Sequence, residues 1–200
     1  MKLSVCIQAG GQSRRMGQNK ALMPFVGKPL IQRVVERVRS IASELIIISN
    51  DRTAFEFLNL PIIPDRIAGQ GALSGLYTSL SASKHPFVAP VACDMPFINP
   101  TLLQAELDLL VTSRVDVVIP ESPNGLEPLH AVYRRESCLP FVQEALFQEQ
   151  RRLIGWFDRV NVHIMTQLEV AEFDPDKIAF ININTPDDLI WAESLARGGS

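Results

Sequence analysis

The stretch LSVCIQAGGQSRRMGQNKAL, residues 3–22, decides the expected fold. It begins with a short apolar run, residues 3–7, which has the length and the β-branched content of a buried strand. Paired glycines and three cations follow this run directly. A glycine-bearing turn of this kind, placed after a buried strand, is typical of α/β proteins that bind a phosphate group. The stretch therefore predicts an α/β fold with an anion site beyond its first strand.

The residues after this strand suit a nucleoside triphosphate. The glycines let backbone N–H groups approach phosphate oxygens closely. Arg14, Arg15 and Lys20 supply positive charge, since arginine binds phosphate in a bidentate manner and lysine acts as a mobile point charge. Neither G-x-x-x-x-G-K-[ST] nor G-x-G-x-x-G is present, which disfavours the two commoner phosphate motifs. The alternative is a solvated turn that merely carries arginines. The residues expected to contact the triphosphate are Ala9, Gly10, Gly11, Ser13, Gly17 and Lys20.

Strand and helix signals alternate along the rest of the chain. Four short apolar runs are separated by longer segments with helical spacing, which predicts a mostly parallel sheet. Asn99-Pro100 and Thr185-Pro186 each pair an N-cap residue with proline at the first helical position. A further run, 129–133, is expected to pair antiparallel. We therefore predict an α/β, Rossmann-like three-layer sandwich with a mixed, mostly parallel sheet. The four runs cover residues 3–7, 45–49, 87–92 and 115–119.

Length and composition favour one globular domain. The chain has 200 residues, of which 46% are hydrophobic, enough apolar material for a single core. A formal net charge of -3 offers no basic surface for nucleic acid or acidic lipid. Three dispersed cysteines argue against a disulfide framework or a structural zinc site and favour a reducing cytoplasm. No apolar window approaches the roughly 20 residues needed to cross a bilayer. From this and from the net charge, we expect neither a membrane nor a nucleic acid as a partner.

The segment CDMPF, residues 93–97, carries a carboxylate where a ligand would meet the sheet. It follows the strand predicted over 87–92, and ligands of open α/β sheets bind beyond the carboxyl ends of the strands. Asp94 is therefore suited to hold Mg²⁺ against phosphate oxygens. The alternative is that Asp94 only caps a turn before Pro96. Cys93 is expected to be a small buried residue with no partner to activate it as a nucleophile.

A third segment, PDRIAGQGALSGL at 64–76, carries an acid beside glycines. Asp65 offers a hydrogen-bond acceptor to a base or a ribose. Gly71 and Gly75 let the following helix approach a nucleoside closely. The alternative is that these glycines serve only to pack the helix.

The segment FININTPDDL, residues 180–189, carries two amides in alternation. We predict a strand that directs the amides of Asn182 and Asn184 away from the core. The alternative is that both asparagines cap the local turn. In the preceding run EPLHAVY, we interpret His130 as a packed strand residue rather than a catalytic base.

The motif A-G-G-x-S-x-R-M-G-x-x-K-A-L, here residues 9–22, resembles the signature loop of the molybdenum cofactor guanylyltransferases, a branch of the nucleotidyltransferase superfamily. A C-D-x-P segment at 93–96 and an N-x-N-T-P segment at 182–186 are similar to the same family. Gln8 departs from the family pattern, which commonly has an aliphatic residue there, and Asn19 stands where an aspartate often precedes the lysine. Because Gln8 lies where the base is recognised, the choice of base stays open.

The resemblance implies a sheet of the nucleotide-diphospho-sugar transferase type in a single nucleotidyltransferase domain, residues 1–200. Residues 1–98 would bind GTP, and residues 99–200 would bind the acceptor. The implied reaction transfers GMP from GTP to the terminal phosphate of molybdenum-loaded molybdopterin and releases pyrophosphate. Apo-molybdoenzymes and other cofactor-biosynthesis proteins would be partners of such an enzyme.

The resemblance also implies roles for individual residues. Lys20, Arg14 and Asp94 would be catalytic, Asp94 would hold Mg²⁺, and Asn182 and Asn184 would bind the acceptor. Three alternatives remain open. The chain could be a cytidylyltransferase acting on the same pterin, a sugar-phosphate or lactate-phosphate nucleotidyltransferase, or a non-catalytic nucleotide-binding carrier of the cofactor.

Overall fold

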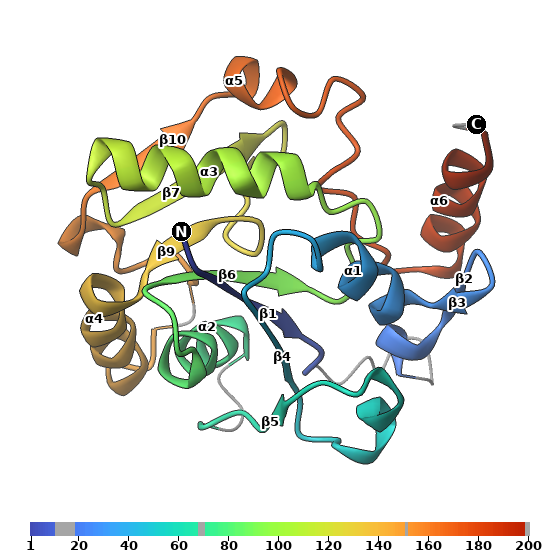
Figure 1. Cartoon of the computed structure of the whole chain (residues 1–200), viewed down its shortest axis with the longest axis horizontal. Helices are drawn as coiled ribbons and strands as arrows, with labels where there is room; N and C mark the ends of the chain where they lie inside the picture. Colours follow the sequence, from blue (N-terminus) through green and yellow to red (C-terminus); the bar gives the residue numbers. More distant parts are fainter. Residues whose placement is uncertain (11–18, 68–70, 151, 199–200) are drawn as a thin grey trace.

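The computed structural model describes residues 1–10, 19–67, 71–150 and 152–198. An eight-stranded sheet runs through its centre in the order β10-β7-β9-β6-β1-β4-β5, with β8 paired to β7 (Figure 1). The strands of this sheet are β1 (Leu3–Gln8), β4 (Glu44–Ile48), β5 (Ile62–Ile63), β6 (Phe87–Ala92), β7 (Val117–Ser122), β8 (Gly125–Leu126), β9 (Val132–Arg134) and β10 (Val162–Met165). The remaining two strands, β2 (Pro24–Phe25) and β3 (Lys28–Pro29), form a small hairpin.

The sheet is mixed and mostly parallel, as predicted. The first strand, β1, lies between β4 and β6 and is parallel to both. Only β9 and β8 run against their neighbours, and β9 comes from the run expected to be antiparallel. Because β1, β4, β5 and β6 are parallel, their carboxyl ends meet at one edge of the sheet, where the glycine loop leaves β1.

Helices cover both faces of the sheet and make the three predicted layers (Figure 1). One face is covered by α1 and α3, whose buried side chains pack on Leu3, Val5 and Ile7 of β1. The other is covered by α2 and α4, which pack on Cys6 of β1 and on Ile46 and Ile48 of β4. The helices are α1 (Leu30–Val38), α2 (Gly71–Ala82), α3 (Pro100–Ser113), α4 (Arg135–Phe147), α5 (Gln167–Ala171) and α6 (Pro186–Gly198), with 3-10 turns η1 (Lys20–Leu22), η2 (Thr53–Leu58) and η3 (Phe157–Arg159).

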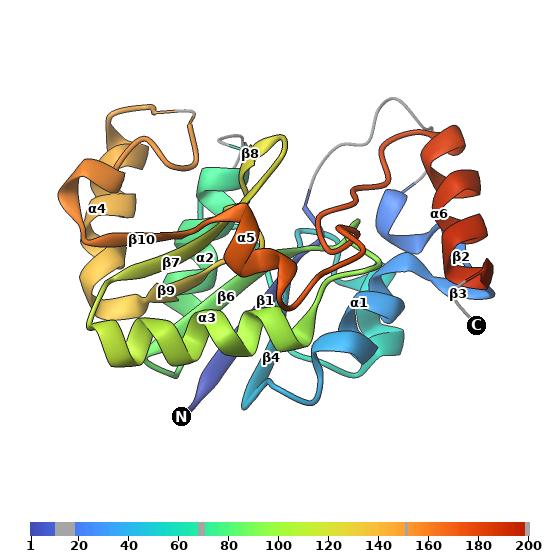
Figure 2. The ribbon, with the colours of Figure 1, turned by 90° about the horizontal axis from the view of Figure 1, so that it is seen from above.

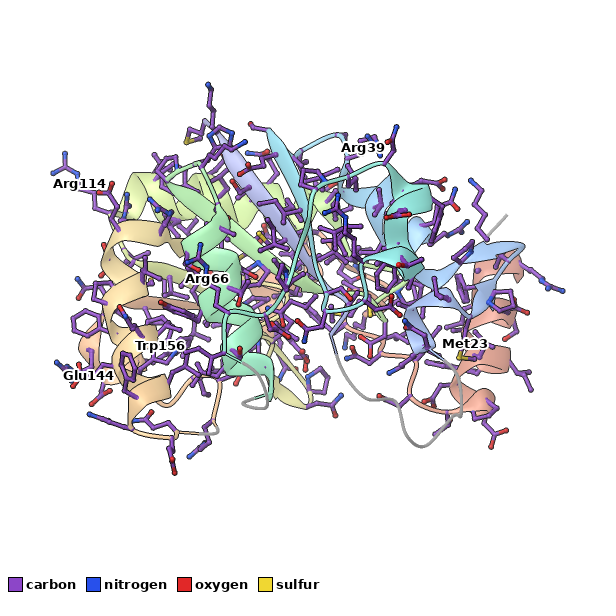
Figure 3. All side chains as sticks on the ribbon, turned by 90° about the horizontal axis from the view of Figure 1, so that it is seen from below. Met23, Arg39, Arg66, Arg114, Glu144 and Trp156 are labelled. Atoms are coloured by element: carbon purple, nitrogen blue, oxygen red, sulfur yellow. The ribbon has the colours of Figure 1, made fainter. Side chains whose placement is uncertain are left out.

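Smaller features complete the two faces. Trp156 lies beside α4 and is buried against Tyr133, with ring centroids 6.2 Å apart (Figure 3). At the other end of the molecule, α6 packs on the β2–β3 hairpin (Figure 2). Phe25, Ile183 and Ala192 form the centre of this third apolar cluster. Among the described residues, no helix is long and apolar enough to cross a membrane.

Both predicted helix starts are confirmed. Asn99 Oδ1 accepts from the N–H groups of Thr101 and Leu102, at 2.9 and 3.1 Å. Thr185 Oγ1 accepts from the Asp188 N–H at 3.1 Å, and Asp188 Oδ2 accepts from the Thr185 N–H at 2.8 Å, which is a capping box. These caps fix where α3 and α6 begin, and each follows a segment that contributes to the site.

The strand predicted in the segment 180–189 is wrong. Residues 181–184 are irregular, although their side chains alternate as in a strand, and α6 begins at Pro186. Ile183 is buried in the third apolar cluster, while the flanking Asn182 and Asn184 point away from it. The backbone of Ile183 donates to the Asp94 carbonyl rather than to a neighbouring strand. The alternation thus reflects packing between a loop and a helix, not pairing in the sheet.

Candidate functional site

Lys20 and Asp94 form the centre of the candidate site. Lys20 begins η1, and Asp94 lies two residues beyond the end of β6. The Lys20 ammonium donates to Asp94 Oδ2 at 2.5 Å and to Asn184 Oδ1 at 2.8 Å. The side chains of Lys20 and Asp94 are 15% and 20% exposed. The structure therefore brings together the predicted catalytic lysine, the predicted metal ligand and one of the two predicted acceptor residues.

Backbone contacts fix the orientation of Asn184. On one side, the Ile183 N–H donates to the Asp94 carbonyl at 3.0 Å. On the other, Asp188 Oδ2 accepts from the N–H groups of Asn184 and Thr185, at 2.8 Å each. These two hydrogen bonds hold the pKa of Asp188 below its usual value. The amide of Asn184 is thus directed at the lysine by anchored neighbours, and it does not serve as a local cap.

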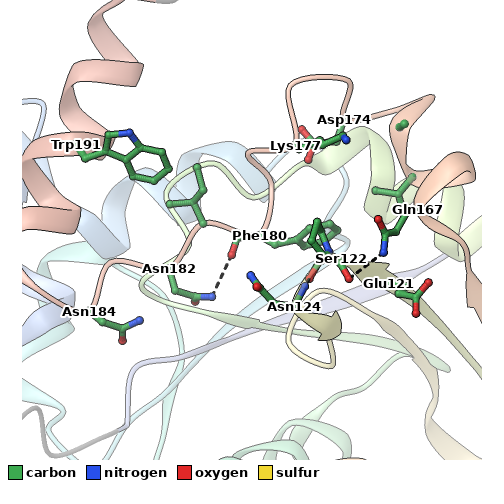
Figure 4. Close-up of a pocket in the computed structure, with 14 residues that line it drawn as sticks. Glu121, Ser122, Asn124, Gln167, Asp174, Lys177, Phe180, Asn182, Asn184 and Trp191 are labelled. Atoms are coloured by element: carbon green, nitrogen blue, oxygen red, sulfur yellow. Dashed lines mark hydrogen bonds between the residues drawn. The ribbon is translucent and has the colours of Figure 1, made fainter.

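A pocket of about 430 Å³ adjoins this centre (Figure 4). Asn184 forms part of its wall, so the pocket and the Lys20–Asp94 pair share one residue. Asn182 also lines the pocket, but its amide donates to the Phe180 carbonyl at 3.1 Å, which is a local contact. Other lining residues are Glu121, Ser122, Asn124, Gln167, Lys177 and Trp191.

Trp191 is one of several lining residues that sequence reasoning missed. Its side chain lies on α6 and is 53% exposed, although it borders the pocket (Figure 4). A lone tryptophan within an amphipathic helix normally belongs to the core, and nothing in its spacing distinguishes this one. The only sequence signal was its position six residues after the N-cap that follows Asn182 and Asn184.

A second group of predicted residues lies at the ends of β1 and β5. A Cβ added to Gly10 would lie 3.0 Å from Asp65 Oδ2, so a larger residue here would require the Asp65 carboxylate to shift by a few tenths of an ångström. Asn50, just beyond β4, accepts from the Asp65 N–H through its Oδ1 at 3.0 Å. Burial raises the pKa of Asp65. Gly71 opens α2 with a φ of 63°, a conformation that favours glycine. Sequence reasoning missed Asn50, which has no motif around it.

Several predicted residues lie outside the described part of the chain. These are Gly11, Ser13, Arg14, Arg15 and Gly17 of the glycine loop. Of the residues predicted before the loop, Ala9 is described, and its N–H donates to the Ile48 carbonyl at 2.9 Å. The described residues on the two sides of the loop thus lie at different places: Gly10 is next to Asp65, and Lys20 is bound to Asp94.

The metal prediction depends on Asp94. Within residues 1–10, 19–67, 71–150 and 152–198, no three His, Cys, Asp or Glu side chains cluster as a metal-binding group. Magnesium is commonly bound by one or two carboxylates together with substrate phosphates, which suits a single aspartate beside a triphosphate loop. Burial, and then the Asp94 carboxylate, raise the pKa of Cys93 to about 12. The Cys93 thiol therefore stays protonated, which disfavours it as a nucleophile; the residue is half-buried rather than buried as predicted.

His130 is a packed residue, as predicted, and its partner is an acid that sequence reasoning missed. His130 and Glu106 are fully buried, with His130 Nδ1 3.0 Å from Glu106 Oε1. The His130 ring also meets Phe180 of the pocket wall edge-on, with centroids 5.1 Å apart. Burial raises the pKa of Glu106 to about 7, and His130 acts in the opposite direction. A glutamate on the apolar face of α3, beside Leu103 and Leu107, was the available signal.

Comparison with known proteins identifies the family. Residues 5–162 match the model of the MobA-like NTP transferase domain. The chain belongs to this family. Two relatives named probable molybdenum cofactor guanylyltransferase come from Pelotomaculum thermopropionicum and Carboxydothermus hydrogenoformans. The first is 35% identical over 95% of this chain and 91% of its own. The second is 37% identical over 93% and 92%. The chain is accordingly a nucleotidyltransferase of molybdenum cofactor biosynthesis.

Solved structures confirm the fold. The crystal structure of molybdopterin-guanine dinucleotide biosynthesis protein A from Archaeoglobus fulgidus superposes with a TM-score of 0.84 at 29% identity, covering 98% of this chain and 99% of that one. CMP:2-keto-3-deoxy-manno-octonic acid synthetase complexed with CTP gives 0.71 at 16% identity, with both chains covered completely. The second likeness concerns the fold alone. The MobA-like chain thus has the nucleotide-diphospho-sugar transferase fold that the resemblance implied.

Proposed function

We propose that the protein transfers GMP from GTP to the terminal phosphate of molybdenum-loaded molybdopterin, which yields a dinucleotide cofactor and pyrophosphate. The names of its relatives support guanylyl transfer to this cofactor. The observation that carries the proposal is the position of Asn184. This residue lines the pocket and binds Lys20, so an acceptor in the pocket would lie beside the residues proposed to hold the triphosphate.

Residues 1–98 form the proposed nucleotide-binding half of a single domain. Lys20 and Arg14 would offset the charge of the triphosphate and of the transition state at its α-phosphorus. Asp65 would accept hydrogen bonds from the base. Close backbone contacts would come from Ala9, Gly10, Gly11, Ser13, Gly17, Gly71 and Gly75.

Asp94 fits a magnesium ion. Its carboxylate is partly exposed, and its partner Lys20 carries a flexible ammonium rather than a rigid structural group. When bound, Mg²⁺ would neutralise charge on the phosphate oxygens. Lys20 would then exchange its contact with Asp94 for one with a phosphate, and its four-carbon stem allows this movement. Asn184 would keep the lysine in place during the exchange, since its backbone is anchored independently.

Residues 99–200 form the proposed acceptor half. Trp191 offers an aromatic face to a planar pterin, and Asn182 and Asn184 offer amides to its polar groups. The second pKa of a phosphate monoester is about 6, so the acceptor phosphate is largely dianionic near neutral pH and attacks without a general base. This requirement agrees with the burial of His130, whose ring is fully enclosed.

The decisive experiment measures pyrophosphate release with Mg²⁺ and either GTP or CTP, with and without molybdenum-loaded molybdopterin. We expect release from GTP that depends on the acceptor. Asp94→Ala should abolish turnover without changing the melting temperature greatly. Asp108→Ala is the matched control, because Asp108 is exposed on α3 and its side chain accepts only from Gln104 among the described residues.

The other outcomes identify the competing functions. Acceptor-dependent release from CTP would make the chain a cytidylyltransferase. Release that requires a sugar phosphate instead of the pterin would place its substrate elsewhere in the superfamily. Binding of GTP without release would indicate a non-catalytic carrier. Full activity of Asp94→Ala would remove Asp94 from the metal site and leave the assignment of the reaction intact.

A further inference from the structure

Gln8 lies against a helix that has no side chain at the point of contact. It is the last residue of β1, and its carboxamide rests on Gly75 of α2. A Cβ built on Gly75 would lie 2.5 Å from Gln8 Oε1 and 2.7 Å from Gln8 Cδ. An alanine at position 75 would therefore displace the end of the glutamine side chain. Because Gly75 has no side chain, the Gln8 carboxamide can occupy this space.

Strand pairing places Asp65 at the same corner. Gln8 is paired with Ile48, and Ile48 is paired with Ile63. Gly10 and Asp65 each lie two residues beyond this row of paired residues. A Cβ built at position 10 would lie 3.0 Å from Asp65 Oδ2, so the two residues are in contact. The corner therefore combines one carboxamide and one carboxylate with two glycines.

Both polar side chains have an atom without a partner. In the described part of the chain, four buried side-chain N or O atoms make no hydrogen bond, and two of them are Gln8 Nε2 and Asp65 Oδ1. An unpaired buried donor or acceptor costs about 1–3 kcal/mol, so folded proteins rarely retain one without a reason. Here a donor and an acceptor are left unpaired at a single corner. A ligand that offers one acceptor next to donors would satisfy both.

We propose that Gln8 selects the base of the nucleotide: its carboxamide N–H donates to the O6 carbonyl of guanine, while the Asp65 carboxylate accepts from the N1–H and 2-amino groups. This inference rests on the proposed nucleotide site and adds a specificity residue to it. Guanine presents an acceptor beside two adjacent donors on one edge. Cytosine and adenine each present a single amino donor there, so they would leave one carboxylate oxygen unpaired.

The test compares nucleotides that differ in one group. Binding of GTP, 6-thio-GTP and inosine triphosphate, without acceptor, is measured by calorimetry for the wild type and for Gln8→Met. Methionine has the length of glutamine but no N–H donor. We expect the wild type to favour GTP over 6-thio-GTP by about 10-fold, the worth of one hydrogen bond. Gln8→Met should lose this preference and keep that of GTP over inosine triphosphate, which reports on the 2-amino group.

A double-mutant cycle separates this role from a structural one. Gly75→Ala should remove the preference for oxygen over sulfur in the wild-type background, because the new methyl group displaces the carboxamide. In a Gln8→Ala background the same substitution should have no further effect. Gln104→Leu, on α3, is the matched control and should leave every affinity unchanged. The melting temperature of Gln8→Met should not fall, since Gln8 Nε2 makes no hydrogen bond with any residue that the structure describes.

The opposing results are distinct. An unchanged preference for GTP over 6-thio-GTP in Gln8→Met, with tight GTP binding retained, would overturn the role of Gln8 and leave the proposed function standing. A fall in melting temperature together with uniformly weaker binding of all three nucleotides would make Gln8 a structural residue. Failure of the wild type to bind any of them would overturn the proposed function, and this inference with it.

Discussion

Substitution of the buried Glu106 by glutamine should make the protein more stable at alkaline pH. Glu106 is fully enclosed beneath α3, with His130 as its polar partner and Oε2 unpaired among the described atoms. Its pKa is raised from 4.5 to about 7, chiefly by burial. Glutamine reproduces the shape of the protonated acid but cannot ionise. The substitution therefore removes one titration and leaves the packing almost unchanged.

The sign and the size follow from proton linkage. The pKa of Glu106 is higher in the folded protein than in the unfolded chain. The contribution of protonated Glu106 to the free energy of unfolding is therefore complete below about pH 4.5 and is lost as the pH rises through 7. At about 1.4 kcal/mol for each pH unit between the two pKa values, the full loss is about 3 kcal/mol. Most of it falls between about pH 5 and pH 8. Over that interval the free energy of unfolding of Glu106→Gln should rise relative to the wild type by about 2–3 kcal/mol.

Urea titrations at several pH values measure this difference directly, with the denaturant slope checked for constancy. Glu172→Gln serves as the control, because Glu172 is exposed at the end of α5 and its difference from the wild type should not depend on pH. A pH-independent difference for Glu106→Gln would refute the reasoning. So would an increase of the wild-type stability from pH 5 to pH 8 that Glu106→Gln abolishes, since this would mean that Glu106 is buried as a stabilised anion.

Three further predictions concern the site and the core. Lys20→Ala should lower the rate of pyrophosphate release by about 100-fold or more while lowering the melting temperature by only a few degrees, and the reverse pattern would assign Lys20 a structural role. Asn184→Ala should lower kcat, because the Lys20 ammonium loses a hydrogen-bond partner, whereas Asn182→Ala should mainly raise the KM for the acceptor substrate. Steady-state kinetics measures both parameters, and an identical effect of the two substitutions would contradict the roles assigned here. Leu103→Ala should reduce the free energy of unfolding by about 3 kcal/mol in a urea titration, because this side chain is fully buried; a loss below about 1 kcal/mol would mean that the face of α3 repacks.

Much of the fold could be predicted because its signals are local. The apolar run of β1, the cap at Asn99 and the cap at Thr185 each depend on a few adjacent residues, and each was placed within a few residues of its observed start. The proximity of Lys20 to Asp94 could also be predicted. In a parallel sheet, a loop after β1 and a turn after β6 lie at the same edge, and β1 and β6 are direct neighbours.

The contacts that sequence reasoning missed depend on distant segments. Glu106 and His130 are 24 positions apart, and Asn50 and Asp65 are 15 apart. No local pattern records which pairs will meet. Glu106 is a charged residue on the apolar face of α3, which indicates an unusual position, but the sequence does not indicate that His130 is its partner. Such pairs follow only once the order of the strands is known.

The irregular backbone of residues 181–184 explains how Asn184 reaches Lys20. Alternating side chains are expected whenever a chain runs between an apolar layer and a polar one, whether or not a neighbouring strand is present. Here Ile183 enters the apolar cluster under α6, and its N–H binds the carbonyl of Asp94. A strand paired in the sheet would have used that N–H in a ladder. Because it binds the Asp94 carbonyl instead, the neighbouring Asn184 reaches Lys20, and this one residue belongs both to the pocket wall and to the Lys20–Asp94 pair.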